Sequence, residues 1–235
     1  MSSTKKKARI AGAIYVLLVI TGVLSLLYIP STYIVTGDAT ATANNIASSE
    51  LLFRTGILIG LASQIIFVFL VLALYRLFKE INHRQALLMV TLVVVAASGG
   101  FLNTLNQVAA SIFLSDADFL SVFEKPQLEA LAYAFLRLES QGWQALQIFW
   151  GLWLFPFGLL VYKSRFIPKI LGVLLIVAGF GYLLSSFMFF ILPQYTDTTS
   201  LLATILQIGE LPIVLWLVTM GATTQAGTEE QAVNA

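Results

Sequence analysis

The stretch that decides the fold is residues 144–168, which read QALQIFWGLWLFPFGLLVYKSRFIP. Its apolar run has the amides Gln144 and Gln147 at one end and aromatic and basic residues at the other. A transmembrane helix needs about 20 predominantly apolar residues, and basic residues gather at its cytoplasmic end. The stretch therefore predicts a membrane-spanning helix whose C-terminal end faces the cytoplasm.

The composition extends this prediction to the whole chain. Its 235 residues are 58% hydrophobic and 11% charged, whereas a soluble domain has about 25% charged residues. The formal net charge is +1, and the basic residues are sorted by loop, so the predicted partner is the lipid bilayer and no nucleic acid. We expect an all-α integral membrane protein.

Six apolar runs are long enough to cross a bilayer as helices. We expect a bundle of six transmembrane helices in a single domain of residues 1–221, followed by a disordered cytoplasmic tail of residues 222–235. A cleaved signal peptide is the alternative for the first run, but its apolar part would be about 7 to 15 residues long. The predicted spans are residues 10–29, 51–77, 85–113, 142–161, 170–192 and 201–220.

Two short helices are predicted outside the spans. Gly37 and Asp38 supply a turn and an N-cap for a helix over residues 39–47. The second helix follows Pro126, because Leu128, Leu131, Phe135 and Leu138 recur with helical spacing. We expect this amphipathic helix to lie on the extracytoplasmic membrane surface before the chain enters the fourth span.

The orientation follows from the distribution of charge. Ten of the thirteen Lys and Arg residues fall on the side that contains the N-terminus. The opposite side carries three basic and eight acidic residues, a net charge of −5. Because cytoplasmic loops are enriched in Lys and Arg, both termini are predicted to be cytoplasmic.

Glu210 is the sharpest polar signal, because it lies near the middle of the sixth span. A carboxyl group at that depth must be protonated, paired or hydrated. One interpretation is a functional site, and the other is a protonated carboxyl that only holds helices together. Several spans carry polar residues at a similar depth, so we expect a ligand pocket open to the outside and closed below by Trp150, Trp153 and Phe157. The candidate ligand-binding residues are Arg54, Asn103, Asn106, Gln107, Gln144, Gln147, Gln207 and Glu210.

Each of these signals has a plainer interpretation. Arg54 could extend toward lipid phosphates, and the tryptophans could pack in the core or against lipid. Gly56 and Gly60 allow a close helix crossing, either within the chain or in a homo-oligomer. Cys is absent and His83 is the single histidine, so no catalytic residue, metal site or cofactor is predicted.

Several short stretches of the sequence together resemble a known family. They are Ala8–Gly12, Ala41–Ile46, Leu52–Arg54, Leu72–Leu77, Phe101–Asn103, Leu105–Gln107, Gln147–Ser164, Ile170–Gly172 and Gly179–Tyr182. The chain resembles in them a family of prokaryotic multi-pass membrane proteins that is defined only as a domain of unknown function, numbered in the four thousand three hundreds. The resemblance covers most of the chain to about residue 192, and the last span matches less clearly. It implies a prokaryotic cell membrane and about six helices, and it transfers no catalytic residue.

Three functions are consistent with the sequence. The first is a membrane protein, not an enzyme, that binds or moves a small polar or amphipathic ligand through the pocket. The second is a structural or regulatory membrane subunit in which the amides only join helices. The third is an intramembrane enzyme acting on lipid, for which the usual catalytic constellations are missing.

Overall fold

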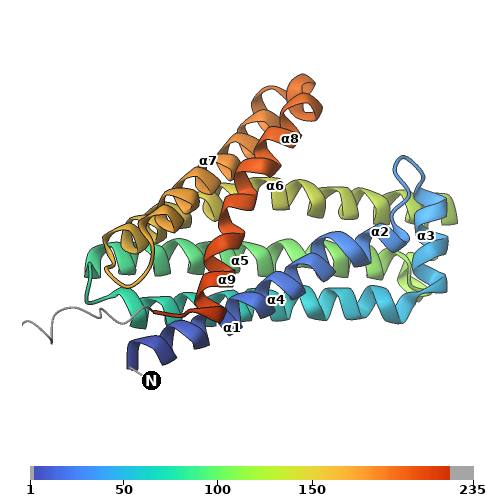
Figure 1. Cartoon of the computed structure of the whole chain (residues 1–235). Coiled ribbons are helices and arrows are strands. Elements are labelled where there is room, and N and C mark those ends of the chain that lie inside the picture. Colours follow the sequence, from blue (N-terminus) through green and yellow to red (C-terminus); the bar gives the residue numbers. More distant parts are fainter. Residues whose placement is uncertain (1–2, 223–235) are drawn as a thin grey trace, which may run out of the picture. The chain divides into compact units, whose positions relative to one another are not determined.

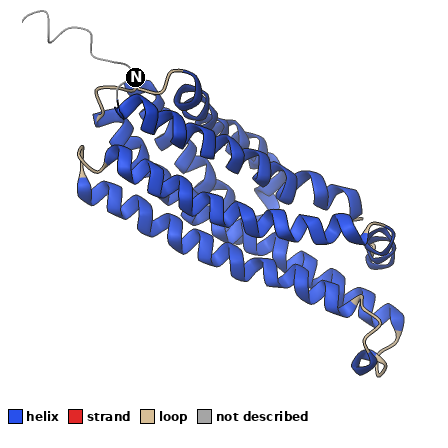
Figure 2. Cartoon of the chain, turned by 90° about the horizontal axis from the view of Figure 1, so that it is seen from below, coloured by secondary structure: helices blue, strands red, loops and turns tan. Residues whose placement is uncertain are grey.

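The computed structural model describes residues 3–222, which form helices joined by short loops, without a strand in that range (Figures 1 and 2). The α-helices are α1 Ser3–Val23, α2 Ile29–Tyr33, α3 Ala39–Ser48, α4 Glu50–Phe78, α5 His83–Phe113, α6 Lys125–Lys163, α7 Lys169–Ile191, α8 Thr196–Gln207 and α9 Leu211–Thr219. A π-helical segment, Leu24–Tyr28, joins α1 to α2, and 3₁₀ turns cover Asp118–Leu120, Pro193–Tyr195 and Ile208–Glu210.

The predicted six spans are confirmed within residues 3–222. The helices long and apolar enough to cross a membrane are Thr4–Tyr33, Glu50–Phe78, His83–Phe113, Lys125–Lys163, Lys169–Ile191 and Thr198–Thr219. The protein is therefore an all-α multi-pass membrane protein. The cytoplasmic position of its termini stays a prediction, and residues 223–235 of the predicted tail lie outside the described residues.

The first span is longer at both ends than residues 10–29. At its N-terminal end the helix includes the basic residues from Lys5 to Arg9. At its C-terminal end it passes through the π-helical segment into α2, where Pro30 occupies the first helical turn. Proline is tolerated there because the N–H groups of a first turn have no helical partner.

The fourth span begins earlier than predicted, and the preceding surface helix is not a separate element. Lys125–Lys163 is one α-helix of 39 residues. The predicted apolar stripe is also displaced by one residue. Leu138 is 52% exposed, while the residues buried at helical spacing are Glu129, Ala132, Leu136 and Glu139. This stripe packs against other helices of the protein, and the position of the segment relative to the membrane surface stays a prediction.

The chain forms two compact units, which we describe separately. Unit 1 contains the described residues of 1–16, 68–95 and 147–235, and unit 2 contains residues 17–67 and 96–146. Helices α1, α4, α5 and α6 each contribute one part to each unit. The prediction of a single domain over residues 1–221 stays a prediction.

The core of unit 2 joins α2 and α3 to α4, α5 and α6. Tyr33 packs edge-on against Phe53 with ring centroids 5.2 Å apart. Ile29, Ile46 and Leu136 belong to the same buried cluster. Removing these apolar side chains from contact with solvent favours folding of unit 2.

The short helix α3 begins as predicted. The Asp38 carboxylate accepts a hydrogen bond of 2.8 Å from the backbone N–H of Ala41, which is N-cap geometry. Gly37 has φ +83°, a conformation that favours glycine. The buried Glu129 of α6 also holds this helix, since its carboxylate accepts a 2.6 Å bond from the Thr40 hydroxyl.

The core of unit 1 contains stacked aromatic rings at the C-terminal end of α6. Phe157 is fully buried, with its ring 5.3 Å from that of Trp153 and 5.8 Å from that of Phe78. Phe166, in the loop after α6, also stacks on Phe78, with ring centroids 5.8 Å apart. These contacts attach the α6–α7 loop to the end of α4.

Glycines let α6 and α7 cross with backbones in contact. A Cβ atom added at Gly172 would lie 2.6 Å from the carbonyl oxygen of Gly158. One added at Gly151 would lie 2.7 Å from the carbonyl oxygen of Gly179. Only residues without a side chain fit at such a crossing, which is common between membrane helices. Helix α7 packs on its other side against α8 and α9 (Figure 1).

Candidate functional site

Glu210 lies at an interruption of the sixth span. Residues Ile208–Glu210 form a 3₁₀ turn between α8 and α9, and Pro212 stands in the first turn of α9. Proline has no N–H to continue the helical hydrogen bonds, so the span changes from one helical segment to the next at this point. The carboxyl group is therefore carried on a local irregularity within an apolar helix.

Two tyrosines from other helices hold this carboxyl group. The Tyr182 hydroxyl of α7 donates a 2.9 Å hydrogen bond to Glu210 Oε2. The Tyr15 hydroxyl of α1 donates to Glu210 Oε1. Each carboxylate oxygen thus has one donor, and a carboxylate offers about four lone-pair positions in all. The arrangement joins α1, α7 and the sixth span through one acidic side chain.

Tryptophans surround the tyrosines. The Trp150 ring stands perpendicular to Tyr182 with centroids 6.1 Å apart, and Trp153 lies 6.2 Å from Tyr15. Tyr15 and Trp153 are buried, whereas Tyr182, Trp150 and Glu210 are half-buried. We call these five residues the Glu210 cluster. The sequence analysis did not predict either tyrosine as a site residue. The available signal was that a tyrosine inside an apolar run needs a polar partner for its hydroxyl.

Gln147 and Gln207 form a hydrogen bond with each other. In the sequence, each lies three residues before a member of this cluster, Trp150 and Glu210 respectively. Gln207 Nε2 donates long hydrogen bonds of 3.4 Å to Gln147 Oε1 and 3.5 Å to the carbonyl oxygen of Gly181. Both glutamines are half-buried. Three of the predicted site residues, Gln147, Gln207 and Glu210, therefore lie in unit 1 on α6, α8 and the turn after α8.

A second buried acid lies in unit 2. Glu139 is 7% exposed, and one of its oxygens accepts bonds from Gln107 Nε2 at 3.1 Å and from the Trp143 indole. Its backbone carbonyl accepts a 2.9 Å bond from Asn103 Nδ2. Asn106 Nδ2 in turn donates 3.0 Å to the backbone carbonyl of Asn103. These residues of α5 and α6 form the Glu139 cluster.

Glu139 is one of the eight acidic residues that the sequence analysis counted as charge on the side opposite the N-terminus, and its burial was not predicted. The signal was present in the spacing, because Glu139 precedes Trp143 by four residues and follows Glu129 by ten, on one helical face. Gly142 lies at the same contact between α5 and α6. A Cβ atom there would collide with the Asn103 side chain, so this glycine lets α5 and α6 approach.

Two predicted site residues, Arg54 and Gln144, are not among the residues of the Glu210 and Glu139 clusters described above. Arg54 is exposed and pairs with Glu50, one helical turn earlier. It lines a groove of about 540 Å³ together with Ser111 and Asp116. Gln144 is half-buried on α6. The predicted pocket drew its residues from both units, and a single pocket that combines them stays a prediction.

The face of α4 that carries Gly56 and Gly60 contacts the first span of the same chain. A Cβ atom at Gly56 would lie 2.9 Å from Ile29 Cγ2, and one at Gly60 would lie 3.8 Å from Ser25 Cβ. The glycine pair therefore serves a helix crossing within unit 2. A homo-oligomer formed through these glycines stays a prediction.

Comparisons with known proteins place the chain in a family. Residues 10–221 match the family described as Domain of unknown function (DUF4386). The chain belongs to this family. The DUF4386 match includes all six spans, the last one among them, so the resemblance seen in the sequence is confirmed and extends further than expected.

One curated relative is archaeal. A protein of Archaeoglobus fulgidus, described as uncharacterized, is 34% identical over 74 residues. The matched region is 32% of this chain and 43% of the relative, so the chain spans less than half of that protein's length. No solved structure matches the chain.

Proposed function

We propose that this DUF4386 protein binds or moves a small amphipathic cation, such as an amine, at the Glu210 cluster. The observation that supports the proposal is a carboxyl group inside a membrane span, with both oxygens positioned by tyrosine hydroxyls and tryptophan rings beside those tyrosines. Ionisable residues inside membrane segments are expensive and usually mark ligand or ion sites.

The chemistry of the cluster favours a cation over an anion. A carboxylate attracts positive charge, and the faces of Trp and Tyr rings attract cations through their quadrupoles. The two tyrosine bonds leave lone pairs on the carboxylate for a ligand N–H. An anion would be repelled by a negative carboxylate and by the negative ring faces.

Partial exposure supports access to the site. Glu210, Tyr182 and Trp150 are half-buried rather than sealed in the core, as are the adjoining Gln147 and Gln207. Gln207 Nε2 makes long bonds of 3.4 and 3.5 Å to Gln147 Oε1 and to the carbonyl oxygen of Gly181, and a polar ligand could replace these two bonds at little cost. An aromatic ligand body would lie against the tryptophans, and its charged end would face Glu210.

The test is equilibrium binding of benzylammonium to the purified full-length chain, followed by tryptophan fluorescence. The matched probe is its neutral analogue with carbon in place of nitrogen. We expect Glu210→Gln to weaken binding of the cation by about tenfold, equivalent to about 1.4 kcal/mol, and to leave the neutral probe unchanged. Glu80→Gln is the control, because the Glu80 side chain is 84% exposed in a loop.

Two results would contradict the cation site. One is equal affinity for the charged and neutral probes in the unaltered protein. The other is the same loss of affinity in Glu80→Gln as in Glu210→Gln. Thermal unfolding of each variant, measured in the same detergent, separates a lost ligand contact from a lost fold.

A structural or regulatory subunit is the second candidate function. It is favoured by the hydrogen bonds themselves, since the Glu210 and Glu139 clusters both connect helices of this chain. In that case Glu210→Gln lowers thermal stability without changing the response to any cation, and crosslinking recovers a partner protein. Turnover of a lipid by the purified protein, lost in Glu210→Gln, would favour the third function, an intramembrane enzyme.

We further propose that the protein resides in a prokaryotic cell membrane with both termini in the cytoplasm. The excess of Lys and Arg in the loops on the N-terminal side supports this orientation. A reporter that is active only outside the cytoplasm, fused after Ala235, is expected to stay inactive. Activity of that fusion would reverse the orientation.

A further inference from the structure

The loop between α6 and α7 has a fixed backbone and exposed basic side chains. The Ser164 hydroxyl donates a 2.8 Å hydrogen bond to the carbonyl oxygen of Val161, one of the carbonyl groups in the last turn of α6. Ile167 is 4% exposed and Phe166 stacks on Phe78. The apolar side chains thus anchor the loop, while Lys163, Arg165 and Lys169 are exposed.

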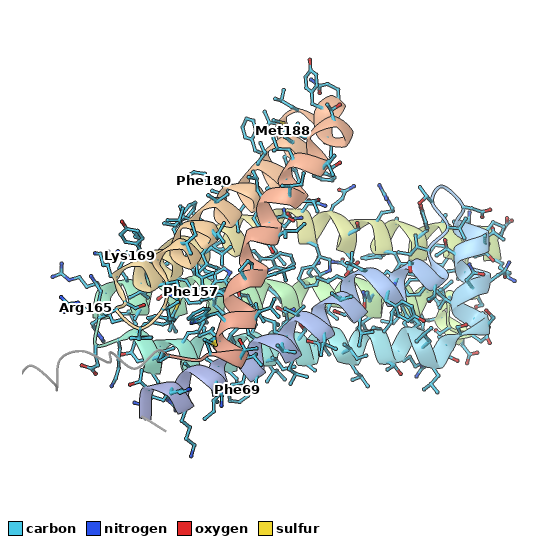
Figure 3. All side chains as sticks on the ribbon, viewed as in Figure 1. Phe69, Phe157, Arg165, Lys169, Phe180 and Met188 are labelled. Carbon is cyan, nitrogen blue, oxygen red and sulfur yellow. The ribbon has the colours of Figure 1, made fainter. Side chains whose placement is uncertain are left out.

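A groove of about 580 Å³ is formed at this loop. Its lining includes all three basic residues together with Tyr162, Ser164, Ile167 and Pro168. Lys169 also lies 5.5 Å from the centre of the Tyr162 ring. Figure 3 shows Arg165 and Lys169 at the end of α7 that joins this loop. None of the three basic residues forms an ion pair with a carboxylate in the described part of the chain.

Three positive charges around one groove favour an anion with several oxygens. Arginine can bind phosphate through two parallel hydrogen bonds, and lysine contributes a compact charge with three donors. Carboxylates are absent from the groove lining, so positive charge is not balanced locally. A phosphate group is the common biological anion of this size and geometry.

The helix faces next to the groove carry exposed apolar side chains. Leu159 precedes Lys163 by four residues on α6, and Val173 follows Lys169 by four residues on α7. Residues spaced by four share a helix face. Leu159 is 37% exposed, Val173 41% and Ile170 60%. Lys163 and Lys169 therefore each lie beside an apolar surface that belongs to a membrane span, and Arg165 lies in the loop between them.

We propose that the α6–α7 groove binds the headgroup of an anionic phospholipid, with Lys163, Arg165 and Lys169 around the phosphate and the acyl chains along Leu159, Ile170 and Val173. A free phosphate compound would use the basic residues alone and would gain nothing from the apolar faces. Basic pockets at the ends of membrane helices are suited to anionic lipid headgroups. This site is separate in sequence from the Glu210 cluster and does not depend on a ligand there.

The experiment is native mass spectrometry of the full-length chain in detergent with added phosphatidylglycerol, phosphatidylcholine of the same acyl chains, or glycerol phosphate. We expect preferential retention of phosphatidylglycerol. The triple variant Lys163→Gln, Arg165→Gln and Lys169→Gln should lower that retention by about tenfold or more, equivalent to about 1.4 kcal/mol or more. Replacing Lys163 and Lys169 by Arg should preserve it.

A second triple variant provides the matched control. Arg76→Gln, Lys79→Gln and Arg84→Gln remove the same charge from exposed residues near the α4–α5 loop. An equal loss of phosphatidylglycerol in this variant would overturn the proposal, because the effect would then reflect net charge. Equal retention of phosphatidylcholine, or retention of glycerol phosphate as strong as that of the lipid, would also overturn it.

Discussion

Replacing Gly172 by alanine tests the close crossing of α6 and α7. The new Cβ atom would lie 2.6 Å from the carbonyl oxygen of Gly158 and 2.7 Å from the backbone nitrogen of Tyr162. Ordinary contacts begin at 3.4 Å, so the shortfall at the oxygen is about 0.8 Å. Both obstructing atoms belong to the backbone of α6, and rotation of a side chain cannot remove the collision.

The helices must therefore move apart, and the surrounding contacts are loosened with them. Overpacking of a well-packed site costs about 1 to 3 kcal/mol. The substitution would otherwise stabilise the helix, since alanine is favoured over glycine inside a helix by about 0.5 to 1 kcal/mol. We expect the unfolding free energy to fall by about 1 to 2 kcal/mol after this partial compensation.

The assay is reversible denaturant unfolding of the purified protein in a fixed detergent. Gly22→Ala in α1 is the control, because a Cβ atom there meets nothing within 4 Å. The control should be as stable as the unaltered protein or slightly more stable. If Gly172→Ala were as stable as Gly22→Ala, the inferred backbone contact between α6 and α7 would be refuted.

Two further predictions concern unit 2. Gln107→Leu removes a donor from the buried Glu139 carboxyl and should lower the unfolding free energy by about 1 to 3 kcal/mol. The same change at Gln141, which is exposed on α6, should cost less in the same denaturant assay. Asp38→Ala removes the N-cap of α3 and should cost about 1 kcal/mol, while Asp38→Asn should retain most of the stability. Hydrogen exchange that stays equally slow in α3 of the alanine and asparagine variants would contradict the capping role.

Local composition was sufficient for the parts of the fold that depend on near neighbours. The six spans follow from apolar length, because a helix is the simplest way for one segment to satisfy its backbone inside a bilayer. The N-cap at Asp38 was predictable for the same reason, since the cap bonds to a residue only three positions away. The presence of Glu210 in an apolar run also identified a polar site.

Partner choice depended on the tertiary structure. Glu210 pairs with Tyr15 and Tyr182, which lie far from it in the chain, and no local pattern selects them over the amides that we expected. Glu139 resembles a solvated charge in the sequence, yet it is buried because the stripe of α6 that faces other helices is displaced by one residue from the apolar stripe. Sequence periodicity determines which residues share a helix face, whereas packing against other helices decides which face is buried.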